Sequence, residues 1–434
     1  MARIKVAYVG GGSTRGPGTM WSFVEHAAGF EGSEFVLIDL DEDRLALVKE
    51  IAERLARDAG ADITVTTTTD QAAGLEDCDA VLTSYRPGGF EARVLDERIP
   101  LKYDVIGQET QGPGGFFMAL RSIAAMQSIV ADLERVAPGA KIFNYTNPVN
   151  IVAQAVADNT DIPIVSMCEG PWIYPSELLE AIGMDPKRAD IVSVGLNHAS
   201  WSIRHTYDGE DLIPLLARKW EELEGDPELT GEPREMLRLA VAMGTLPSFY
   251  FQYYYFEREH LAALKAKPTT RAEDILAEAP DYWRHYEEQA REEVPRLDPA
   301  LSRGGLQELE LAVDAIEAVF NDTGRVLPVN VPNQGSLPGF ADDLVVETLG
   351  RCDKDFVTPL PQPALPPRHV LGLVEDLAEY QRAAAEAAWS GSAVDGVRAL
   401  AAHPLVRSLD VAERLYAERA EAHRQYLPER LLTV

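Results

Sequence analysis

The length, composition and charge of the chain exclude several classes of protein. Its 434 residues carry 40 Lys and Arg against 70 Asp and Glu, a formal net charge of −30 at pH 7. Such an acidic surface repels phosphate backbones, so we expect no nucleic-acid partner. Apolar residues make up 46% of the chain and charged residues 25%, the balance of a folded globular protein of about two domains.

The sequence shows no signal for export or for a membrane. No run of 18 apolar residues appears, and the N-terminus enters a strand pattern without the apolar core of a signal peptide. The cysteines Cys78, Cys168 and Cys352 have no paired spacing. We therefore expect a reduced, cytoplasmic setting and no membrane partner.

Short apolar strands alternate with helical patterns in the first 170 residues. A helix pattern spans about 20–28, and a long amphipathic helix starts at Asp41. Strands are expected at 4–9, 35–38, 63–67, 80–83, 141–144 and 162–167. This alternation predicts an α/β fold with a Rossmann-like, doubly wound parallel sheet.

The pattern changes beyond residue 170. One more strand, at 191–194, is followed by charged helical segments, an aromatic run at 249–256 and a helical region at 370–425 that is interrupted at Pro404. We expect a second, mixed and largely helical α+β domain at 171–434.

A glycine-rich turn after the first strand predicts a dinucleotide site. Gly10 and Gly12 match G-x-G-x-x-G, but Arg15 stands in the third position. Backbone N–H groups near Ser13 and Thr14 at a helix start can bind a pyrophosphate. Asp39 ends the next strand, where a carboxylate binds a ribose diol and favours NAD over NADP. These features predict that residues 1–170 form an NAD-binding domain. The alternative is a tight turn without a ligand.

Further polar residues are expected at the carboxyl edge of the sheet, where ligands bind in such folds. Arg86 follows the fourth strand and begins a long, Gly-rich crossover at 86–115, which we expect to be a functional loop before a helix at Phe116. Cys168 and His198 each end a strand, and thiolate with imidazole suits a divalent transition metal. A core cysteine and a hydrogen-bonded histidine are the alternative.

Taken together, these segments resemble glycoside hydrolase family 4, the NAD- and metal-dependent glycosidases that include 6-phospho-β-glucosidases. The resemblance spans nearly the whole chain. It rests on GGGS at 10–13, RPGG at 86–89, DERIPLKY at 96–103, GQET-x-GPGG at 107–115, TNP at 146–148, Cys168, GLNH at 195–198, the tyrosines at 250–255, NQGS-x-P-x-x-x-DD-x-VVE at 333–347 and His403-Pro404.

The resemblance implies a redox-elimination mechanism instead of hydrolysis by two carboxylates. NAD oxidises the sugar at C3, which acidifies the C2 proton. A base removes that proton while a divalent metal stabilises the enediolate. The leaving group departs from C1 by elimination, water adds, and the hydride returns to C3.

The resemblance also implies roles for individual residues. Cys168 and His198 are the metal ligands, with manganese as the usual family metal and iron, cobalt or nickel left open. Tyr250 takes the place of the base and Glu109 that of the general acid; an aromatic core patch and a loop salt bridge are the alternatives. Arg86 is a cofactor or anion contact. Sugar hydroxyls or the nicotinamide region are expected to contact Asn147 and Asn197.

The sequence departs from the family pattern where a 6-phosphate is expected to bind. The departures lie at Ser13-Thr14-Arg15, at Glu169 after the metal cysteine, and after Arg303-Gly304-Gly305. Three readings stay open: a 6-phospho-β-glucosidase, a glycosidase for a sugar with a sulfonate, a carboxylate or no charge at C6, and an NAD-dependent sugar or hydroxyacid dehydrogenase. Altered recognition of C6 would involve Arg15, Glu169, Trp172 and Arg303.

The resemblance further implies a homodimer or homotetramer, built largely from the 171–434 domain. The net charge of −30 adds a test of substrate class. If the ligands are NAD and an anionic sugar, the site needs a local cluster of positive charge, with Arg15, Arg86 and Arg303 as its expected members. Arginines that form outward salt bridges would favour a neutral sugar.

Overall fold

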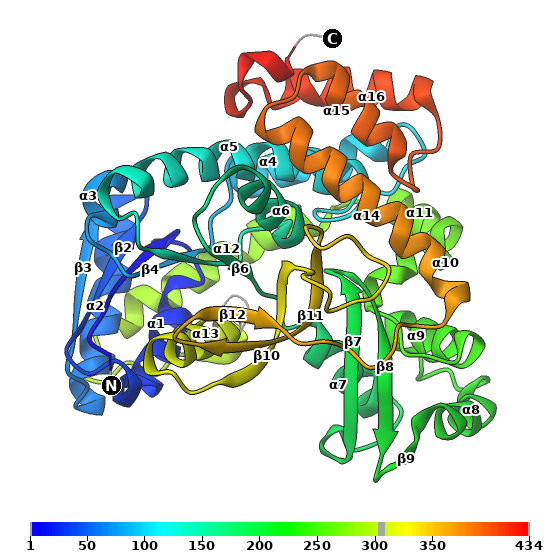
Figure 1. Cartoon of the computed structure of the whole chain (residues 1–434), viewed down its shortest axis with the longest axis horizontal. Coiled ribbons are helices and arrows are strands. Elements are labelled where there is room, and N and C mark those ends of the chain that lie inside the picture. Colours follow the sequence, from blue (N-terminus) through cyan, green and yellow to red (C-terminus); the bar gives the residue numbers. More distant parts are fainter. Residues whose placement is uncertain (1, 303–308, 433–434) are drawn as a thin grey trace.

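One continuous sheet organises the computed structural model, which describes residues 2–302 and 309–432 (Figure 1). Within those residues the sheet has twelve strands, in the order β3-β2-β1-β4-β5-β6-β10-β11-β7-β8-β9, with β12 paired to β11. The first six are parallel and follow the Rossmann strand order, which confirms the predicted doubly wound sheet. They are β1 (Lys5–Val9), β2 (Ser33–Ile38), β3 (Ile63–Thr68), β4 (Ala80–Thr83), β5 (Lys141–Asn144) and β6 (Ile164–Ser166).

Strands beyond residue 170 extend this sheet in antiparallel fashion. β10 pairs with β6, and β11 lies between β10 and β7. The sheet is therefore mixed, and it runs without a break across residue 170, so the domain boundary expected there stays a prediction. The added strands are β7 (Ala189–Leu196), β8 (Ala199–Tyr207), β9 (Glu210–Asp211), β10 (Arg325–Pro332), β11 (Val345–Asp353) and β12 (Phe356–Pro359).

Helices cover both faces of the parallel part of the sheet. In β1 the side chains of Val6 and Tyr8 join one apolar cluster, and those of Ala7 and Val9 join the other, as the period of two in a strand requires. The first face carries α1 (Gly16–Glu25), α2 (Glu42–Ala59) and α13 (Glu310–Asn321); the second carries α3 (Gln71–Leu75), α5 (Gly112–Val136), α6 (Val149–Asn159) and α14 (Arg368–Trp389).

The remaining helices belong mostly to the second half of the chain. Of these helices, α12 comes from the later part of the sequence but packs against α2 and α4, which precede it by more than 150 residues. The helices are α4 (Gly89–Leu101), α7 (Gly170–Ala181), α8 (Leu212–Leu223), α9 (Gly231–Met243), α10 (Gln252–Tyr255), α11 (Glu257–Ala266), α12 (Arg271–Gln289), α15 (Ala393–Ala402) and α16 (Leu409–Ala422).

Helix α5 is long and apolar enough, by length and composition alone, to cross a bilayer, although it contains no unbroken run of 18 apolar residues. One 18-residue window in it has a mean hydropathy of 1.4, but 67% of that window is buried inside the protein. Buried core helices share this composition, and α5 packs against α3, α4, α6 and α14. Its hydropathy is that of a core helix.

Two expectations about the elements are wrong. The segment 86–115 is not one long loop, because α4 occupies its middle and α5 begins at Gly112, four residues before Phe116. Gly88 caps α4 in a left-handed conformation (φ 84°), and Pro100 lies in its last turn. The first helix likewise begins at Gly16, with Pro17 in its first turn, and not near residue 20.

A fully buried ionic cluster fixes α4 against α5 and α16. The Asp96 carboxylate accepts hydrogen bonds from Arg121 Nη2, at 2.6 Å, and from Arg419, and its Oδ1 lies 3.1 Å from His423 Nε2. Burial alone would raise the pKa of Asp96, but the two guanidinium groups hold it below its usual range. Removing one partner would leave a buried charge uncompensated, so this cluster constrains the packing.

A second cluster, at the end of α1, joins the N-terminal part of the fold to α13. His26 Nε2 lies 2.7 Å from Glu310 Oε1, and His26 Nδ1 lies 2.8 Å from Glu317 Oε2. The hydrogen bond with Glu310 outweighs desolvation and, with Glu317, raises the pKa of His26 to about 9. The imidazolium is therefore the stable form at neutral pH.

This raised pKa predicts a stability that falls at alkaline pH. The contribution of His26 is complete below its unfolded pKa of about 6.5 and is lost as the pH rises through about 9. Replacing His26 with Gln should cost about 1–2 kcal/mol near pH 6, after discounting for solvent screening. The Tm difference from wild type should shrink towards pH 9.5. His369→Gln, at an exposed position, is the control; a difference for His26→Gln that does not vary with pH would contradict the assignment.

Candidate active site

The turn after β1 is packed so closely that glycine is required. Gly10 has φ of +96°, and a Cβ there would lie 2.2 Å from the backbone oxygen of Ser84 at the end of β4. The backbone N–H of Gly12 donates to Asp39 Oδ2 at 3.0 Å, and Asp39 Oδ1 accepts from the N–H of Leu40. Burial raises the pKa of Asp39, although these N–H groups lower it. The turn and the end of β2 therefore form one unit.

The third glycine of the motif lies one residue later than the pattern requires. A Cβ on Gly16 would lie 2.4 Å from the backbone oxygen of Gly11 and 3.1 Å from the Val48 side chain. Gly16 thus permits close packing of α1 on the turn, the role that the last glycine of the motif performs. The packing glycine is therefore present one position after Arg15.

A cavity of about 810 Å³ opens at the carboxyl edge of the parallel strands. Its wall includes the predicted nucleotide residues and the predicted substrate residues nearest to them: Gly10, Gly12, Ser13, Thr14, Arg15, Asp39, Arg86 and Asn147. The far wall comes from α12 and was not predicted. Its lining residues Leu276, Ala279 and Trp283 recur at helical spacing, so one face of α12 covers the cavity.

The two predicted metal ligands lie side by side. Cys168 follows β6, His198 lies in the turn between β7 and β8, and Cys168 Sγ is 3.7 Å from His198 Nε2. His198 Nδ1 lies 3.1 Å from the hydroxyl of Thr110, which leaves Nε2 directed at the thiol. His198 has φ of +63°, a costly conformation for a non-glycine residue that is concentrated at functional sites.

Burial keeps these groups uncharged. It lowers the pKa of His198 to about 3, so the imidazole is neutral and has a lone pair for a ligand. Burial also raises the pKa of Cys168 to about 12, with the nearby charges of Glu347 and Glu169 adding to the effect. Glu347 is itself buried on β11, and desolvation raises its pKa to about 7 while a 3.1 Å hydrogen bond from Asn197 opposes the shift.

Tyr250 lies directly against the predicted metal site. Its ring stacks on the imidazole of His198, with centroids 3.6 Å apart and planes 8° from parallel. Tyr174 of α7 meets it edge-on at 6.0 Å. Burial raises the pKa of Tyr250, and the charge of Glu109 adds to that rise. Tyr250 therefore needs a nearby positive charge to lose its proton at neutral pH.

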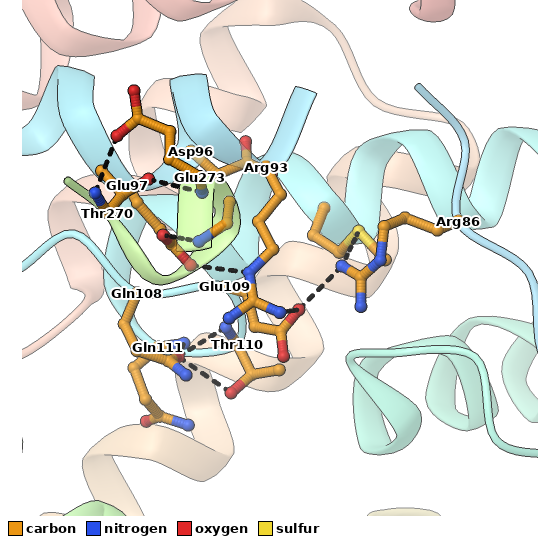
Figure 2. Close-up of polar contacts among 12 residues, drawn as sticks. Arg86, Arg93, Asp96, Glu97, Gln108, Glu109, Thr110, Gln111, Thr270 and Glu273 are labelled. Atoms are coloured by element: carbon orange, nitrogen blue, oxygen red, sulfur yellow. Dashed lines mark hydrogen bonds and ion pairs between the residues drawn. The ribbon is translucent and has the colours of Figure 1, made fainter. Parts of the chain in front are cut away.

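Glu109 is the centre of an ionic chain, drawn in Figure 2. Its Oε2 lies 2.7 Å from Arg86 Nη1 and 2.8 Å from Arg93 Nη1. Arg93 Nε also donates to Glu97 Oε1 at 2.6 Å, and Glu97 Oε2 accepts from the N–H of Ala272 in the first turn of α12 at 2.9 Å. This series of ion pairs and hydrogen bonds connects the cavity wall at Arg86 with α12.

The other predicted substrate residues are more dispersed. Glu169 accepts a hydrogen bond from the hydroxyl of Tyr145, another residue of the cavity wall. Trp172, in the first turn of α7, is 45% exposed. Asn197 is buried and bonded to Glu347, so in this structure its amide N–H₂ is engaged with protein. Arg303 lies outside the described residues.

Sequence reasoning missed several residues of the site. Arg93 and Glu97 are four residues apart on α4 and form an ion pair along one face of that helix. The expectation of a loop at 86–115 gave no reason to pair them. The sequence signal that could have identified Glu347 is a charged residue directly after the apolar pair Val345-Val346 in a strand pattern. The lining face of α12 had no local signal, because its position depends on tertiary packing.

Comparison with known proteins identifies the family. Residues 5–184 match "Family 4 glycosyl hydrolase", and residues 193–406 match "Family 4 glycosyl hydrolase C-terminal domain". The chain belongs to glycosyl hydrolase family 4. It is a glycosidase, as the resemblance implied, and the dehydrogenase reading loses its support. A similarity to malate dehydrogenase from Plasmodium falciparum, at 11% identity and a TM-score of 0.53, shows the shared fold alone.

Relatives of this family 4 enzyme include both α- and β-specific proteins. The chain is 32% identical to "Probable 6-phospho-beta-glucosidase" of Bacillus subtilis (strain 168), over 98% of each. It is 28% identical to a maltose-6'-phosphate glucosidase of Clostridium acetobutylicum, over 99% of this chain and 100% of that one.

Solved structures share this fold over nearly the whole chain. The 6-phospho-beta glucosidase from Thermotoga maritima, with NAD and glucose-6-phosphate, has a TM-score of 0.84 at 26% identity and covers 98% of this chain and 99% of its own. A 6-phospho-alpha-glucosidase from gut microorganisms, in complex with NAD and Mn²⁺, has a TM-score of 0.84 at 25% identity, with 99% and 100% covered.

Proposed function

We propose that this family 4 enzyme is an NAD- and divalent-metal-dependent glycosidase that acts on a glycoside with an anionic group at C6. The carrying observation is that Cys168 and His198 lie 3.7 Å apart with Tyr250 stacked on His198. Their neighbours in the sequence and the fold contact the wall of the 810 Å³ cavity, since Glu109 binds Arg86 and Glu169 bonds Tyr145. Oligomerisation through the second half of the chain remains part of the proposal as a family-level expectation.

The cavity suits NAD. Gly10, Gly12, Ser13 and Thr14 line the cavity directly before α1, so a pyrophosphate bound there would lie beside the N-terminus of that helix. Asp39 lies beside the turn and presents a carboxylate, which binds a ribose diol and repels a 2′-phosphate. Structural relatives at 25–26% identity contain NAD, which supports this choice of cofactor.

The donor set suits a divalent ion. Cys168 and His198 present sulfur and nitrogen at 3.7 Å, and Thr110 orients the imidazole. Two protein ligands leave positions for sugar oxygens. Mn²⁺ occurs in a structural relative, and we propose it here, with iron, cobalt and nickel as alternatives because thiolate is a soft ligand.

In the proposed reaction, bound NAD would supply a reversible hydride acceptor for C3 of the sugar, and a divalent ion held by Cys168 and His198 would supply Lewis acidity. The phenol oxygen of Tyr250 takes the C2 proton, and the ring stack on His198 holds that oxygen in place. Loss of the C1 group by elimination, addition of water and return of the hydride complete the hydrolysis.

Glu109 is the proposed general acid for the leaving oxygen. The two guanidinium groups on its Oε2 stabilise a carboxylate, which is the form that accepts a proton instead of donating one. The acid role therefore requires that substrate binding alter these ion pairs. Holding Arg86 and Arg93 in place is the alternative role that the geometry favours.

The group at C6 is proposed to be a phosphate or another anion. Names of the relatives support a 6-phosphate. The departures at Arg15 and Glu169 support a sulfonate or carboxylate, because Arg15 lies in the cavity wall and Glu169 bonds Tyr145 there. The anomer is open, since both α- and β-glucosidases are among the relatives.

Hydrolysis in D₂O tests the mechanism. The C2 proton is removed by a base and replaced from solvent, so the released sugar should carry deuterium at C2, detected by NMR or mass spectrometry. Absorbance at 340 nm should show no net NADH, because the hydride returns. Protium at C2 would contradict elimination, and stoichiometric NADH would favour a dehydrogenase.

A panel of p-nitrophenyl glycosides tests the anionic group. Both anomers are compared with phosphate, sulfonate, carboxylate and hydroxyl at C6. We expect kcat/KM for an anionic member to exceed that of the neutral sugar by at least about 100-fold, since a buried charge–charge contact contributes about 3 kcal/mol. Cleavage of the 6-phosphate alone would exclude the altered-substrate reading, and equal rates for the neutral sugar would contradict an anionic C6 site.

Cys168→Ser tests the metal site. Removing the thiolate should raise the Kd for Mn²⁺ at least about tenfold and abolish metal-dependent hydrolysis, while NAD binding is retained. Calorimetric titration with each ligand measures both effects. Cys78→Ser, which alters a buried thiol outside the site, is the matched control. Wild-type turnover in Cys168→Ser would exclude the ligand assignment.

A further inference from the structure

A buried carboxylate that the proposed reaction does not use lies next to the predicted metal ligands. Glu347 on β11 is 2% exposed, and it forms the bridge that joins β11 to Gly195 of β7. Two residues beyond Gly195 the chain reaches Asn197, and then His198. A carboxylate is costly to bury without partners, so its hydrogen bonds indicate what it does here.

Glu347 belongs to a row of residues that lie opposite one another across the strands. The row runs from Asn330 on β10 through Glu347 on β11 and Gly195 on β7 to Ser200 on β8. Residues directly opposite one another in a sheet have side chains on the same face. Desolvation raises the pKa of Glu347, and hydrogen bonds from the row and from Asn197 oppose that rise. The donors are uncharged amide and hydroxyl groups, so these contacts hold the carboxylate as an acceptor of hydrogen bonds.

Asn197 connects this carboxylate to the sulfur of Cys168. Its Nδ2 donates to Glu347 Oε1 at 3.1 Å. Burial is the main influence on the pKa of Cys168 and raises it, while hydrogen bonds from the backbone of Gly170 and from Asn197 lower it. The Gly170 nitrogen lies 3.4 Å from Sγ, in the first turn of α7. An amide nitrogen carries two hydrogens, so Asn197 can donate one to Glu347 and the other to the sulfur.

The carboxylate determines which way the Asn197 amide points. A carboxylate only accepts hydrogen bonds, so Nδ2 must face Glu347 and the amide oxygen must face away from it. A reversed amide would present an oxygen, which is no donor, to the sulfur. Glutamine at position 347 would have both a donor and an acceptor and would therefore permit either orientation.

We propose that Glu347 is a positioning residue of the metal site, which holds the Asn197 amide so that its N–H orients the Cys168 sulfur. The sulfur then faces His198 Nε2, at the 3.7 Å that separates the two proposed ligands. Partners beyond the ligands commonly orient them in this way and tune their affinity for the ion. The inference rests on the proposed function, because it assumes that Cys168 and His198 bind a divalent ion.

Glu347→Gln tests the inference through binding of Mn²⁺ to the NAD-loaded enzyme, measured by calorimetry. The substitution keeps the size of the side chain but no longer selects one orientation of the Asn197 amide. The Kd for Mn²⁺ should rise about tenfold, as is typical when a partner of a metal ligand is lost, while the Kd for NAD changes less than about twofold. With Co²⁺ as the probe, the near-ultraviolet charge-transfer band of the thiolate should shift or weaken.

Two further variants separate positioning from other effects. Asn197→Ala should raise the Kd for Mn²⁺ about as much as Glu347→Gln, and the double variant should bind Mn²⁺ no more weakly than Asn197→Ala alone. Asp343→Asn is the matched control. It removes one negative charge from the same segment, at an exposed position paired with Arg382, so its Kd and its Co²⁺ band should match those of the wild type.

The outcomes that would overturn the inference are distinct from those that concern the reaction. A wild-type Kd and an unchanged Co²⁺ band in Glu347→Gln would overturn it. Additive losses in the double variant would also overturn it, because Glu347 would then act by its charge and not through Asn197. A wild-type enzyme without a thiolate band on addition of Co²⁺ would contradict the proposed metal site together with this inference. The expected pattern in an enzyme that cleaves no glycoside would support the role of Glu347 and contradict the proposed reaction.

Discussion

The site depends on the insertion of β10 and β11 between β6 and β7. β6 carries Cys168 at its end and β7 leads to His198, and these strands are not neighbours in the sheet. Single bridges, Asn330 to Ser166 and Glu347 to Gly195, attach the inserted hairpin on either side. Since the hairpin sets the spacing of the flanking strands, residues from three distant segments converge where sulfur and imidazole approach to 3.7 Å. Packing of the hairpin thus controls geometry that no local segment could supply.

The net charge of the chain does not describe the charges of its interior. The chain carries −30, yet several arginines of the interior are paired with internal carboxylates: Arg86 and Arg93 with Glu109, and Arg121 and Arg419 with Asp96. Arg86 faces the cavity and not the outer surface, which is the arrangement expected for an anionic ligand. Glu109 offsets part of that positive charge through its ion pairs with Arg86 and Arg93. The cavity wall holds three arginines, Arg15, Arg44 and Arg86, against three carboxylates, Asp39, Asp41 and Glu91, so its positive charge is local and not a net charge.

The sequence predicted most of the parallel sheet and much of the candidate site. Strand patterns and the glycine turn are local, so Gly10, Gly12 and Asp39 could be placed from spacing alone. The family resemblance implied that Cys168 and His198 lie close together. Their separation along the chain could not show this, because it does not determine their distance in the fold. The helix α4 was missed because Gly88 and Pro100 have the same local signal at a helix end as in a loop. The α12 wall and the inserted hairpin were missed because non-local packing alone determines them.

Burial favours the uncharged forms of the proposed metal ligands and of the proposed base. His198 is held neutral with a pKa of about 3, Cys168 is held as a thiol with a pKa of about 12, and the pKa of Tyr250 is raised. A thiol of this kind must release a proton to bind a cation, so at the proposed metal site ion binding and deprotonation of Cys168 would be one coupled event. The same positive charge would act on Tyr250, whose ring lies 3.6 Å from that of His198, and would favour its phenolate. In the proposed mechanism the base would therefore form only after the metal ion is bound, and proton removal from the sugar would be restricted to the complete active site.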